Sequence, residues 1–293
     1  MDRLPISVVI LAFNEEKNIA GCLKSVEGWV EDIFIVDSFS TDKTLEIARR
    51  YTQNIYQHSF ENYGQQRNWA LENLPLKTDW ILNLDADQRV TAPLKEELFK
   101  IFSQGKLNDA NGFMIKTKTV FMGKWIRWGG HYPIYRIYLF RKGKGNYETR
   151  RYHQHCLVEG KIIRLKRDIV DVICPDLTTM IERLNKWSTE EAKEFLEANK
   201  INQVKAHIFG SPIERKRWLR TQVYWRLPLF LRSFLYFFYR YFLRLGFLDG
   251  RQGLTFHFLQ GFLMYFLTDV KIYEYRKIKK YKEEKNDETG RFK

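Results

Sequence analysis

The amino-acid sequence predicts an α/β fold: a doubly wound, mostly parallel sheet flanked by helices, followed by a helical C-terminal segment. Two observations lead to this prediction. Over the first hundred residues, short apolar runs alternate with segments whose apolar residues recur every three or four positions, which is how strands alternate with helices in such sheets. Polar clusters directly follow three of the apolar runs, at the strand ends where doubly wound sheets bind their ligands.

The first strand and helix carry the clearest signals. Residues 6–11 (ISVVIL) form a continuous apolar run, which is typical of a strand buried on both faces. Residues 14–26 are expected to form a helix, because apolar residues from Ile19 to Val26 fall at three- and four-residue steps. The second strand is expected at residues 33–36, where another apolar run ends at an aspartate.

The alternation continues to about residue 102 and then changes. Thr41 is placed to cap a helix that runs to about Tyr51. The next expected elements are strands at 54–57 and 80–84 and helices over 65–73 and 93–102. Beyond residue 112 we expect short strands with glycine-rich turns, at 113–117, 136–140 and 161–165, and then a helix over 177–199.

Charge divides the chain into two parts. Of the net charge of +14, residues 211–293 carry +10, from 18 Lys and Arg against 8 Asp and Glu. We therefore predict a catalytic domain over residues 1–210 and a basic, aromatic tail over 211–293 that meets an anionic surface. The three cysteines lack CxxC spacing and no signal peptide is visible, which predicts a cytoplasmic protein with reduced thiols.

Asp85 and Asp87 directly follow the strand expected at residues 80–84. Two carboxylates one residue apart can share a hard cation such as Mg²⁺ or Mn²⁺ with a diphosphate. Such a cation neutralises the charge that grows on the phosphates as a bound sugar leaves. The alternative is a solvated turn in which Asp87 only caps the next helix. Polar clusters at the ends of two other strands point to the same edge and favour the metal site.

Four sequence segments occur in a characteristic order and spacing: SVVILAFNEEKNI, IVDSFSTDKT, YGQQRNWAL and WILNLDADQRV. Together they resemble family 2 glycosyltransferases of the Rossmann-like GT-A fold, in the branch that builds lipopolysaccharide core and other cell-surface polysaccharides. The likeness covers residues 5–175 and extends to the segments LNKWSTEEA and GFLDGRQG. It implies an inverting hexosyltransferase that uses a divalent metal. The sugar would pass from a nucleotide donor, with UDP as the expected nucleotide, to a glycan or lipid-linked acceptor.

The resemblance also implies roles for individual residues. Arg67 is suited to phosphate, because its planar fork matches phosphate oxygens, and Asp37 is expected on the uracil side. It assigns to the nucleotide Ala12, Asn14, Glu15, Asp37, Ser38, Gln65, Arg67, Asn68 and Asp85, and to the metal Asp85 and Asp87. Two plainer interpretations stay open, in which Asn14 is a helix cap and Arg67 a solvated side chain. Gln88 stands where an acidic residue usually follows the aspartate triplet.

Inverting transfer also needs a general base that takes the proton of the acceptor hydroxyl. The resembled branch carries this carboxylate in a His-Glu pair, but the matching stretch here, residues 152–155, reads YHQH. Its Gln154 carries an amide, which cannot act as a base. Three explanations stay open: another group serves, with His155, Asp171 and Glu148 as candidates; the alignment is shifted; or the chain binds nucleotide without transferring sugar.

A loop at residues 121–133 (FMGKWIRWGGHYP) combines two tryptophans with basic residues and paired glycines. Tryptophan rings stack well on sugars and glycines allow a loop to move. We therefore predict that Trp125, Trp128 and His131 bind the acceptor. The alternative is a turn region whose tryptophans pack in the core.

The tail is predicted to lie on a membrane. Arg232, Arg240 and Arg244 fall at steps of four or eight residues, hence on one helical face, and apolar residues occupy the others. Arginines at this density make a bilayer crossing costly, whereas a helix lying in the interface accommodates both kinds of residue. Residues 254–267 are more apolar but shorter than the roughly 20 residues of a membrane span. A helical hairpin packed on the catalytic domain is the alternative.

These inferences predict a peripheral protein on the inner face of the cell membrane, with an anionic membrane surface as partner. A nucleic-acid partner is disfavoured, because no RNA- or DNA-binding signature is present and residues 229–243 are too apolar. Two other functions stay open. One is a catalytically weakened, nucleotide-binding relative of the glycosyltransferases. The other is a sugar nucleotidyltransferase, which is disfavoured because no glycine-rich, lysine-containing phosphate loop follows the first strand.

Overall fold

The computed structural model forms two compact units, Met1–Leu177 and Thr178–Lys293, and each is described separately. It describes residues 3–105, 107, 109–148, 154–173, 176–197, 207–209 and 212–290. Cys174 and residues 152 and 153 of the YHQH stretch therefore lie outside the described residues. The division falls after Leu177, so the helix that follows belongs to the second unit, whereas our predicted domain boundary lies after residue 210.

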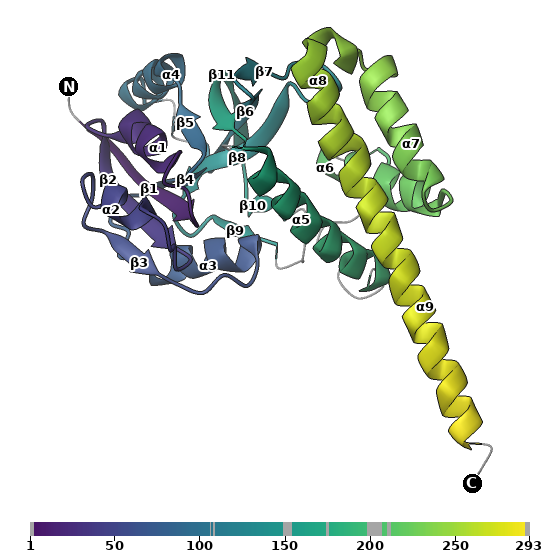
Figure 1. Ribbon diagram of the computed structural model, residues 1–293. Helices are drawn as coiled ribbons and strands as arrows, with labels where there is room; N and C mark the ends of the chain where they lie inside the picture. The colour runs from purple at the N-terminus through teal and green to yellow at the C-terminus, as the bar shows by residue number, and fades with distance from the viewer. Residues whose placement is uncertain are drawn as a thin grey trace. The chain divides into compact units, whose positions relative to one another are not determined.

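The first unit is built on a mixed sheet in the order β3-β2-β1-β4-β8-β6-β11-β5, with β7 paired to β6 (Figure 1). Strands β3, β2, β1 and β4 run parallel to one another, as predicted. The strands are β1 Leu4–Ala12, β2 Val30–Asp37, β3 Ile55–Gln57, β4 Trp80–Asp85, β5 Gln88–Val90, β6 Gly112–Phe121, β7 Lys124–Trp125, β8 Ile134–Arg141 and β11 Ile162–Val172. A separate hairpin pairs β9 Gly145–Tyr147 with β10 Cys156–Val158.

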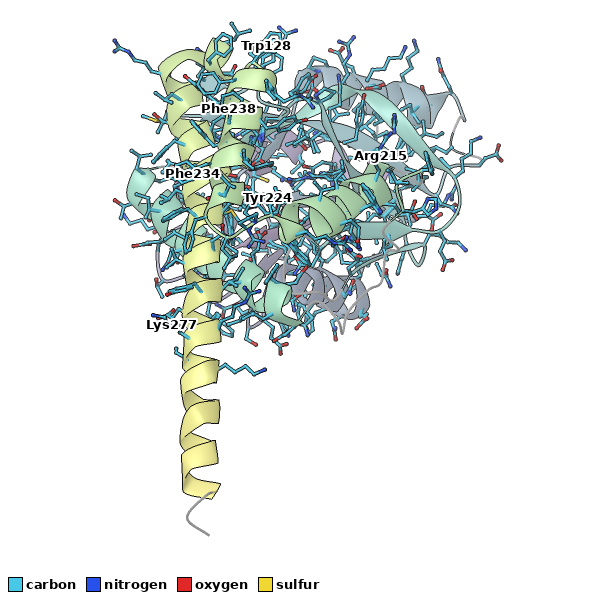
Figure 2. All side chains as sticks on the ribbon, turned by 90° about the vertical axis from the view of Figure 1, so that its right-hand side faces the viewer. Trp128, Arg215, Tyr224, Phe234, Phe238 and Lys277 are labelled. Carbon is cyan, nitrogen blue, oxygen red and sulfur yellow. The ribbon has the colours of Figure 1, made fainter. Side chains whose placement is uncertain are left out.

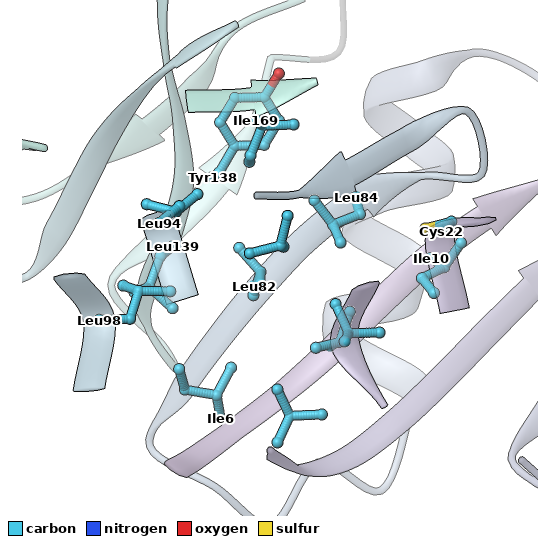
Figure 3. Packing of buried hydrophobic residues seen from close by; sticks show 14 of the residues in the cluster. Ile6, Ile10, Cys22, Leu82, Leu84, Leu94, Leu98, Tyr138, Leu139 and Ile169 are labelled. Atoms are coloured by element: carbon cyan, nitrogen blue, oxygen red, sulfur yellow. The ribbon is translucent and has the colours of Figure 1, made fainter. Parts of the chain in front are cut away.

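Helices cover both faces of this sheet. Successive β1 residues point to opposite faces: Ile10 packs in the cluster that includes Leu23 and Leu94, and Val9 in the cluster that includes Ala70. Figure 3 shows the first of these clusters, with Leu94 and Leu98 beside the strands. The helices are α1 Ile19–Val26, α2 Thr44–Ala48, α3 Tyr63–Asn73 and α4 Ala92–Ser103. The predicted sheet flanked by helices is confirmed.

Two helices begin later than the sequence pattern predicts. Helix α1 begins at Ile19, not at Asn14, and α2 begins at Thr44 without a cap from Thr41. The reason is that polar groups of the two preceding loops bond each other. The Asn14 N–H donates to Ser40 Oγ over 2.9 Å, and Asn14 Oδ1 accepts from the Thr41 N–H over 2.8 Å. Asn14 has a φ of 52°, in the left-handed region, which breaks the helical pattern there.

The described part of the second unit, called here the helical unit, consists of helices and short helical turns. Its α-helices are α5 Leu177–Glu197, α6 Pro212–Trp218, α7 Leu231–Phe238, α8 Gly250–His257 and α9 Met264–Gly290. Its shorter turns are η1 Leu219–Val223, η2 Tyr224–Arg226, η3 Tyr239–Leu243, η4 Gly246–Asp249 and η5 Phe258–Leu263. Over the described residues, we find no helix with both the length and the apolarity that a bilayer crossing requires.

Arg232, Arg240 and Arg244, which we call the arginine row, were predicted to share one helical face, but two of them lie inside the helical unit. Arg232 and Arg240 are only 1% and 7% exposed, and Arg232 forms a 2.5 Å ion pair with the buried Asp269 on α9. Arg244, in contrast, is exposed. Our prediction of a single arginine face that meets an anionic surface is therefore wrong for Arg232 and Arg240. The spacing places them on one face, but the distant Asp269 makes that face an interior one.

Candidate active site at the strand ends

The strand register brings the three polar clusters to one edge of the sheet. Ala12 pairs with Asp37 across β1 and β2, and Leu11 pairs with Asp85 across β1 and β4. Because all three strands are parallel, their carboxyl ends lie together, which is where doubly wound sheets bind ligands.

The loops after β1 and β2 are fastened to each other. The Ser38 N–H donates to the Ala12 carbonyl over 2.9 Å. The fully buried Asp37 accepts from the Ser40 N–H over 2.9 Å and from Gln57 Nε2 over 3.1 Å. Asp37 therefore shapes the rim from beneath. Asn14 bonds Thr41 across the same pair of loops, so it does not serve as the helix cap that we considered.

Glu15 is almost fully buried beside these loops, at 8% exposure. Its N–H donates to Thr44 Oγ1 over 2.7 Å, and its Oε2 accepts from Asn18 Nδ2 over 2.8 Å. These bonds tie the start of α1 to the start of α2, so the loop after β1 is held in one conformation.

Arg67 is buried under this edge, at 1% exposure. Its Nη2 donates to Asp85 Oδ1 over 2.6 Å and to the Leu84 carbonyl over 2.7 Å, and its Nη1 donates to the Val9 carbonyl over 3.0 Å. Its fork is thus engaged within the protein, which makes it neither the solvated side chain nor the phosphate clamp of our sequence interpretations. Burial disfavours the charged guanidinium, but Tyr63 and Asp85 outweigh burial and raise the pKa of Arg67.

We expect Arg67→Met to lower the free energy of unfolding by about 3–5 kcal/mol, because it strands the Asp85 carboxylate. Adding Asp85→Asn should restore part of the loss, since no buried charge is then unpaired. The matched control is Arg50→Met, which removes the exposed pair with Glu46 and should cost about 0.5 kcal/mol or less. Urea unfolding measures all four proteins. Equal losses from Arg67→Met and Arg50→Met would contradict a structural role for the buried pair.

Asp85 is held on its other side by Gln88. Gln88 Oε1 accepts from the Asp85 N–H over 3.0 Å, and Gln88 Nε2 donates to Asp85 Oδ2 over 3.3 Å. An acidic residue at position 88 would place a negative charge against Asp85, whereas the amide donates to it. Asp85 is therefore fixed from both sides, with 29% of its side chain still exposed.

Asp87, two residues after Asp85 in the chain, is half-buried. It is not the cap of the next helix, because Thr91 Oγ1 accepts from the Leu94 N–H at the start of α4. The nearby Cys22 is no rival ligand: burial above all, and then the charges of Asp87 and Asp85, raise the pKa of its thiol.

The pair fits a magnesium-like ion that is shared with a substrate. Such ions take one or two protein carboxylates and complete their coordination with water and substrate phosphates. Among the described residues, no three His, Cys, Asp or Glu side chains gather as a metal cage. Asp85 and Asp87 would hold such an ion together with a diphosphate.

The remaining predicted nucleotide residues on α3 have different surroundings. Gln65 is exposed at the first turn, where its N–H is capped by Asn62 Oδ1 over 3.0 Å. Asn68 bonds the backbone of Tyr147 with both ends of its amide, at 2.9 and 2.7 Å. Asn68 thus fastens β9 to α3, a role that its sequence context does not reveal.

Among the candidates for the general base, Glu148 and His155 contact each other, whereas Asp171 lies on the strand β11. Glu148 is fully buried, and its Oε2 accepts from the His155 N–H over 3.1 Å, which makes it unsuited to meet an acceptor. Gln154 lies beside the start of α3, where its Cγ would stand 3.2 Å from a Cβ placed on Gly64. His155 and Asp171 are both half-buried.

The strand register connects Asp171 to Asp85. Asp171 pairs with Gln88 across β11 and β5, and Gln88 holds Asp85. Tyr138, which sequence reasoning missed, connects the two sides. Burial raises the pKa of Tyr138 to about 12; Arg136 opposes this shift, and Asp171 and Asp85 add to it. The available sequence signal was weak: Arg136 and Tyr138 stand two apart on one strand and so share a face.

The predicted acceptor residues lie in the loop around β7. Trp125 and Trp128 are half-buried, so they are not core fillers. Lys118 Nζ lies 4.5 Å from the centre of the Trp125 ring, and the Arg127 guanidinium lies 5.5 Å from both tryptophan rings. His131 bonds Thr119 Oγ1 over 2.9 Å. The loop therefore presents aromatic rings and cations together, and acceptor binding stays a prediction.

Comparisons with known proteins agree with this geometry. The sequence model of the family described as Glycosyl transferase family 2 matches residues 7–166. The lipopolysaccharide core biosynthesis glycosyltransferase LpsC of Rhizobium meliloti is 27% identical over 288 residues, covering 94% of this chain and 95% of LpsC. An uncharacterized glycosyltransferase of Rickettsia felis is 34% identical over 111 residues, covering 38% of each chain.

Solved structures of similar proteins were also found. The TarS 1–349 structure from S. aureus in complex with UDP-GlcNAc shares 15% identity, with a TM-score of 0.49 and coverage of 94% of this chain and 92% of that one. The mannosyltransferase PcManGT from Pyrobaculum calidifontis, in complex with GDP-Man and Mn²⁺, shares 14% identity, with a TM-score of 0.49 and coverage of 92% and 87%.

The family match spans more than half of the chain and includes the ends of β1, β2 and β4. It covers Asp85, Asp87 and Arg67, and it excludes the sugar nucleotidyltransferase that we kept as an alternative. The chain therefore belongs to glycosyl transferase family 2 and is a glycosyltransferase.

Proposed function

We propose that the protein transfers a sugar, with inversion, from a UDP-sugar to a lipid-linked glycan in lipopolysaccharide core biosynthesis, on the cytoplasmic face of the membrane. The observation that carries this proposal is the arrangement of carboxylates at the carboxyl ends of β1, β2 and β4. There Asp85 is fixed by Arg67 and Gln88, and Asp87 stands half-exposed beside it. The similarity to LpsC along nearly the whole chain supports the choice of pathway.

The donor would lie across the ends of β1, β2 and β4. The rim formed by Ala12, Asn14 and Ser38 would receive the base and ribose, since the loops there are held rigid from below by Asp37. Asp85 and Asp87 would hold Mg²⁺ or Mn²⁺, which when bound supplies positive charge to the sugar diphosphate. The exposed Arg136 on β8 offers a second positive charge, on which the charges of Asp171 and Asp85 act.

Asp171 is the proposed general base. The acceptor hydroxyl oxygen attacks the anomeric carbon and forms the new glycosidic bond while its proton passes to the Asp171 carboxylate. The bond between the anomeric carbon and the diphosphate oxygen breaks, and the nucleoside diphosphate leaves with the electron pair. Asp171 is preferred to His155 because it pairs with Gln88 across β11 and β5, and Gln88 in turn donates to Asp85.

Calorimetric titration with a panel of nucleotide sugars tests the donor assignment. We expect UDP-sugars to bind more tightly than GDP-, CMP- or ADP-sugars, and we expect binding to weaken strongly when Mn²⁺ is replaced by EDTA. A preference for another nucleotide would contradict the UDP assignment. Equal affinity with and without divalent metal would contradict the role of Asp85 and Asp87.

A further inference from the structure

The helical unit buries several charged side chains beside apolar ones such as Phe256, Met264 and Ile272. Its interior holds charged and polar groups: Arg232, Asp269, Arg240 and His257 are all 7% exposed or less. Large apolar residues cover its outside. A helical hairpin surrounded by water normally buries its apolar stripe and leaves few large apolar side chains together on its outside.

The interior groups hold the helices together. Arg232 Nε donates to Asp269 Oδ1 over 2.7 Å, and Asp269 Oδ2 accepts from the Phe230 N–H over 2.8 Å. The Arg240 guanidinium lies 5.8 Å from the centre of the Phe256 ring. Burial above all, and then the charge of Arg240, lowers the pKa of the His257 imidazole to about 3, so that this interior histidine is neutral at physiological pH. These arginines are therefore structural and do not contact a surface.

The outside presents what we call the apolar surface. Its residues come from α7, η3 and the start of η5, and each is between 44% and 65% exposed: Phe234, Leu235, Phe238, Phe242, Leu243 and Phe258. Figure 2 shows Phe234 and Phe238 beside the long helix α9. Ring contacts connect the aromatic residues of the surface, and Phe237 and Tyr241 link Phe258 to Phe242. Phe234 lies 4.6 Å from Phe262, Phe262 lies 5.3 Å from Phe258, and Phe238 lies 5.0 Å from Phe242, as measured between ring centres.

Tyrosines with adjacent cations accompany this surface. Tyr239, which is 43% exposed, accepts a 3.0 Å hydrogen bond from Arg244 Nη1. Tyr273, which is 46% exposed, has Lys277 Nζ 5.2 Å from its ring centre. Exposed tyrosines and basic residues are the side chains that settle at lipid headgroups.

The charge of this region selects the partner. Residues 211–293 carry 18 basic against 8 acidic residues, and Arg244, Arg251 and Lys277 are exposed. A symmetric dimer through the apolar surface would bring the same basic residues against each other. An anionic lipid layer instead offers opposite charge to these cations and acyl chains to the apolar residues.

We propose that the helical unit docks on an anionic lipid bilayer by inserting the apolar surface among the acyl chains, with Tyr239, Arg244, Tyr273 and Lys277 at the headgroups. The proposal specifies how the protein would attach to the membrane that the proposed function names. It depends on the proposed function only for the lipid-linked acceptor. Our sequence prediction had apolar residues and arginines share the attachment; the proposal differs because the buried Arg232 and Arg240 take no part in it.

Sedimentation of the full chain with vesicles tests the proposal. We expect binding to phosphatidylcholine vesicles that contain phosphatidylglycerol, and we expect a substantial part of it to persist in high salt, which screens charge but not insertion. Phe238→Ser/Phe242→Ser should lower the partition coefficient at least about tenfold. The matched control, Leu219→Ser/Val223→Ser, changes residues that are 50% and 45% exposed outside the apolar surface and should change it less than about twofold.

A spectroscopic variant tests insertion itself. The emission of Phe238→Trp, after subtraction of the unmodified chain, should be quenched by lipids with brominated acyl chains. Full release by salt, absent quenching, or an equal loss in the control variant would each overturn the proposal. So would a dimer in sedimentation equilibrium that Phe238→Ser/Phe242→Ser abolishes, because the surface would then bind a second copy. The same variant should bind UDP-sugar normally, which separates failure of docking from failure of the proposed function.

Discussion

Asp87→Ala is expected to weaken the Mn²⁺-dependent binding of a UDP-sugar at least about a hundredfold. A bound divalent ion supplies several kcal/mol of charge stabilisation to phosphate oxygens, and each 1.4 kcal/mol corresponds to a factor of about ten in affinity. The buried pair of Arg67 with Asp85 stays in place in Asp87→Ala, so the variant should remain folded, which urea unfolding checks. Calorimetric titration with Mn²⁺ and with EDTA measures the effect.

The choice of Asp87 over Asp85 makes this test clean. Removing the Asp85 carboxylate would leave Arg67 buried and unpaired, so that lost binding and lost stability could not be separated. Asp79→Ala is the matched control, because Asp79 is an exposed aspartate that precedes the other end of the same strand. If Asp87→Ala binds the UDP-sugar with unchanged affinity in the presence of Mn²⁺, the assignment of a metal ion to Asp87 is wrong.

Asp171→Asn should lower the turnover number by about 10²- to 10⁴-fold while the dissociation constant of the donor stays nearly constant. This is the usual contribution of a general base, and the amide keeps the shape of the side chain while it abolishes the proton acceptor. The matched control is Asp168→Asn on the same strand. Asp168 accepts from the Tyr132 hydroxyl over 2.9 Å, and its loss should leave turnover within about tenfold. Transfer to a lipid-linked acceptor under single-turnover conditions provides the measurement.

Gln154→Glu distinguishes the competing explanations of the missing carboxylate. If Asp171 serves as the base, this change should be neutral or harmful, because it adds a second negative charge without supplying the proton acceptor. A gain of at least about tenfold would show instead that residue 154 holds the base position and that the natural chain is a weakened transferase. Loss of turnover in His155→Ala alone would move the role to His155. An active enzyme that tolerates all three changes would place the acceptor elsewhere.

The sequence predicted the catalytic framework because its signals are local. The apolar run of β1 and the aspartates after β2 and β4 depend on residues that are neighbours in the chain. A parallel sheet then brings those strand ends together without further information. The same reasoning predicted helix boundaries less well. Asn14 and Thr41, which read as helix starts, bond each other across 27 residues of sequence.

The roles of several polar residues were decided only by the tertiary structure. A side chain's face follows from spacing, but whether that face meets water, substrate or a buried partner depends on segments far away in the chain. The sequence assigned Arg67 to a phosphate, but in the structure it donates to Asp85, 18 residues further along the chain. The sequence assigned Arg232 to a membrane surface, but in the structure it pairs with Asp269, 37 residues further along the chain, inside the helical unit. A buried charge requires a partner, and in both cases the sequence shows the charge while only the fold brings the partner to it.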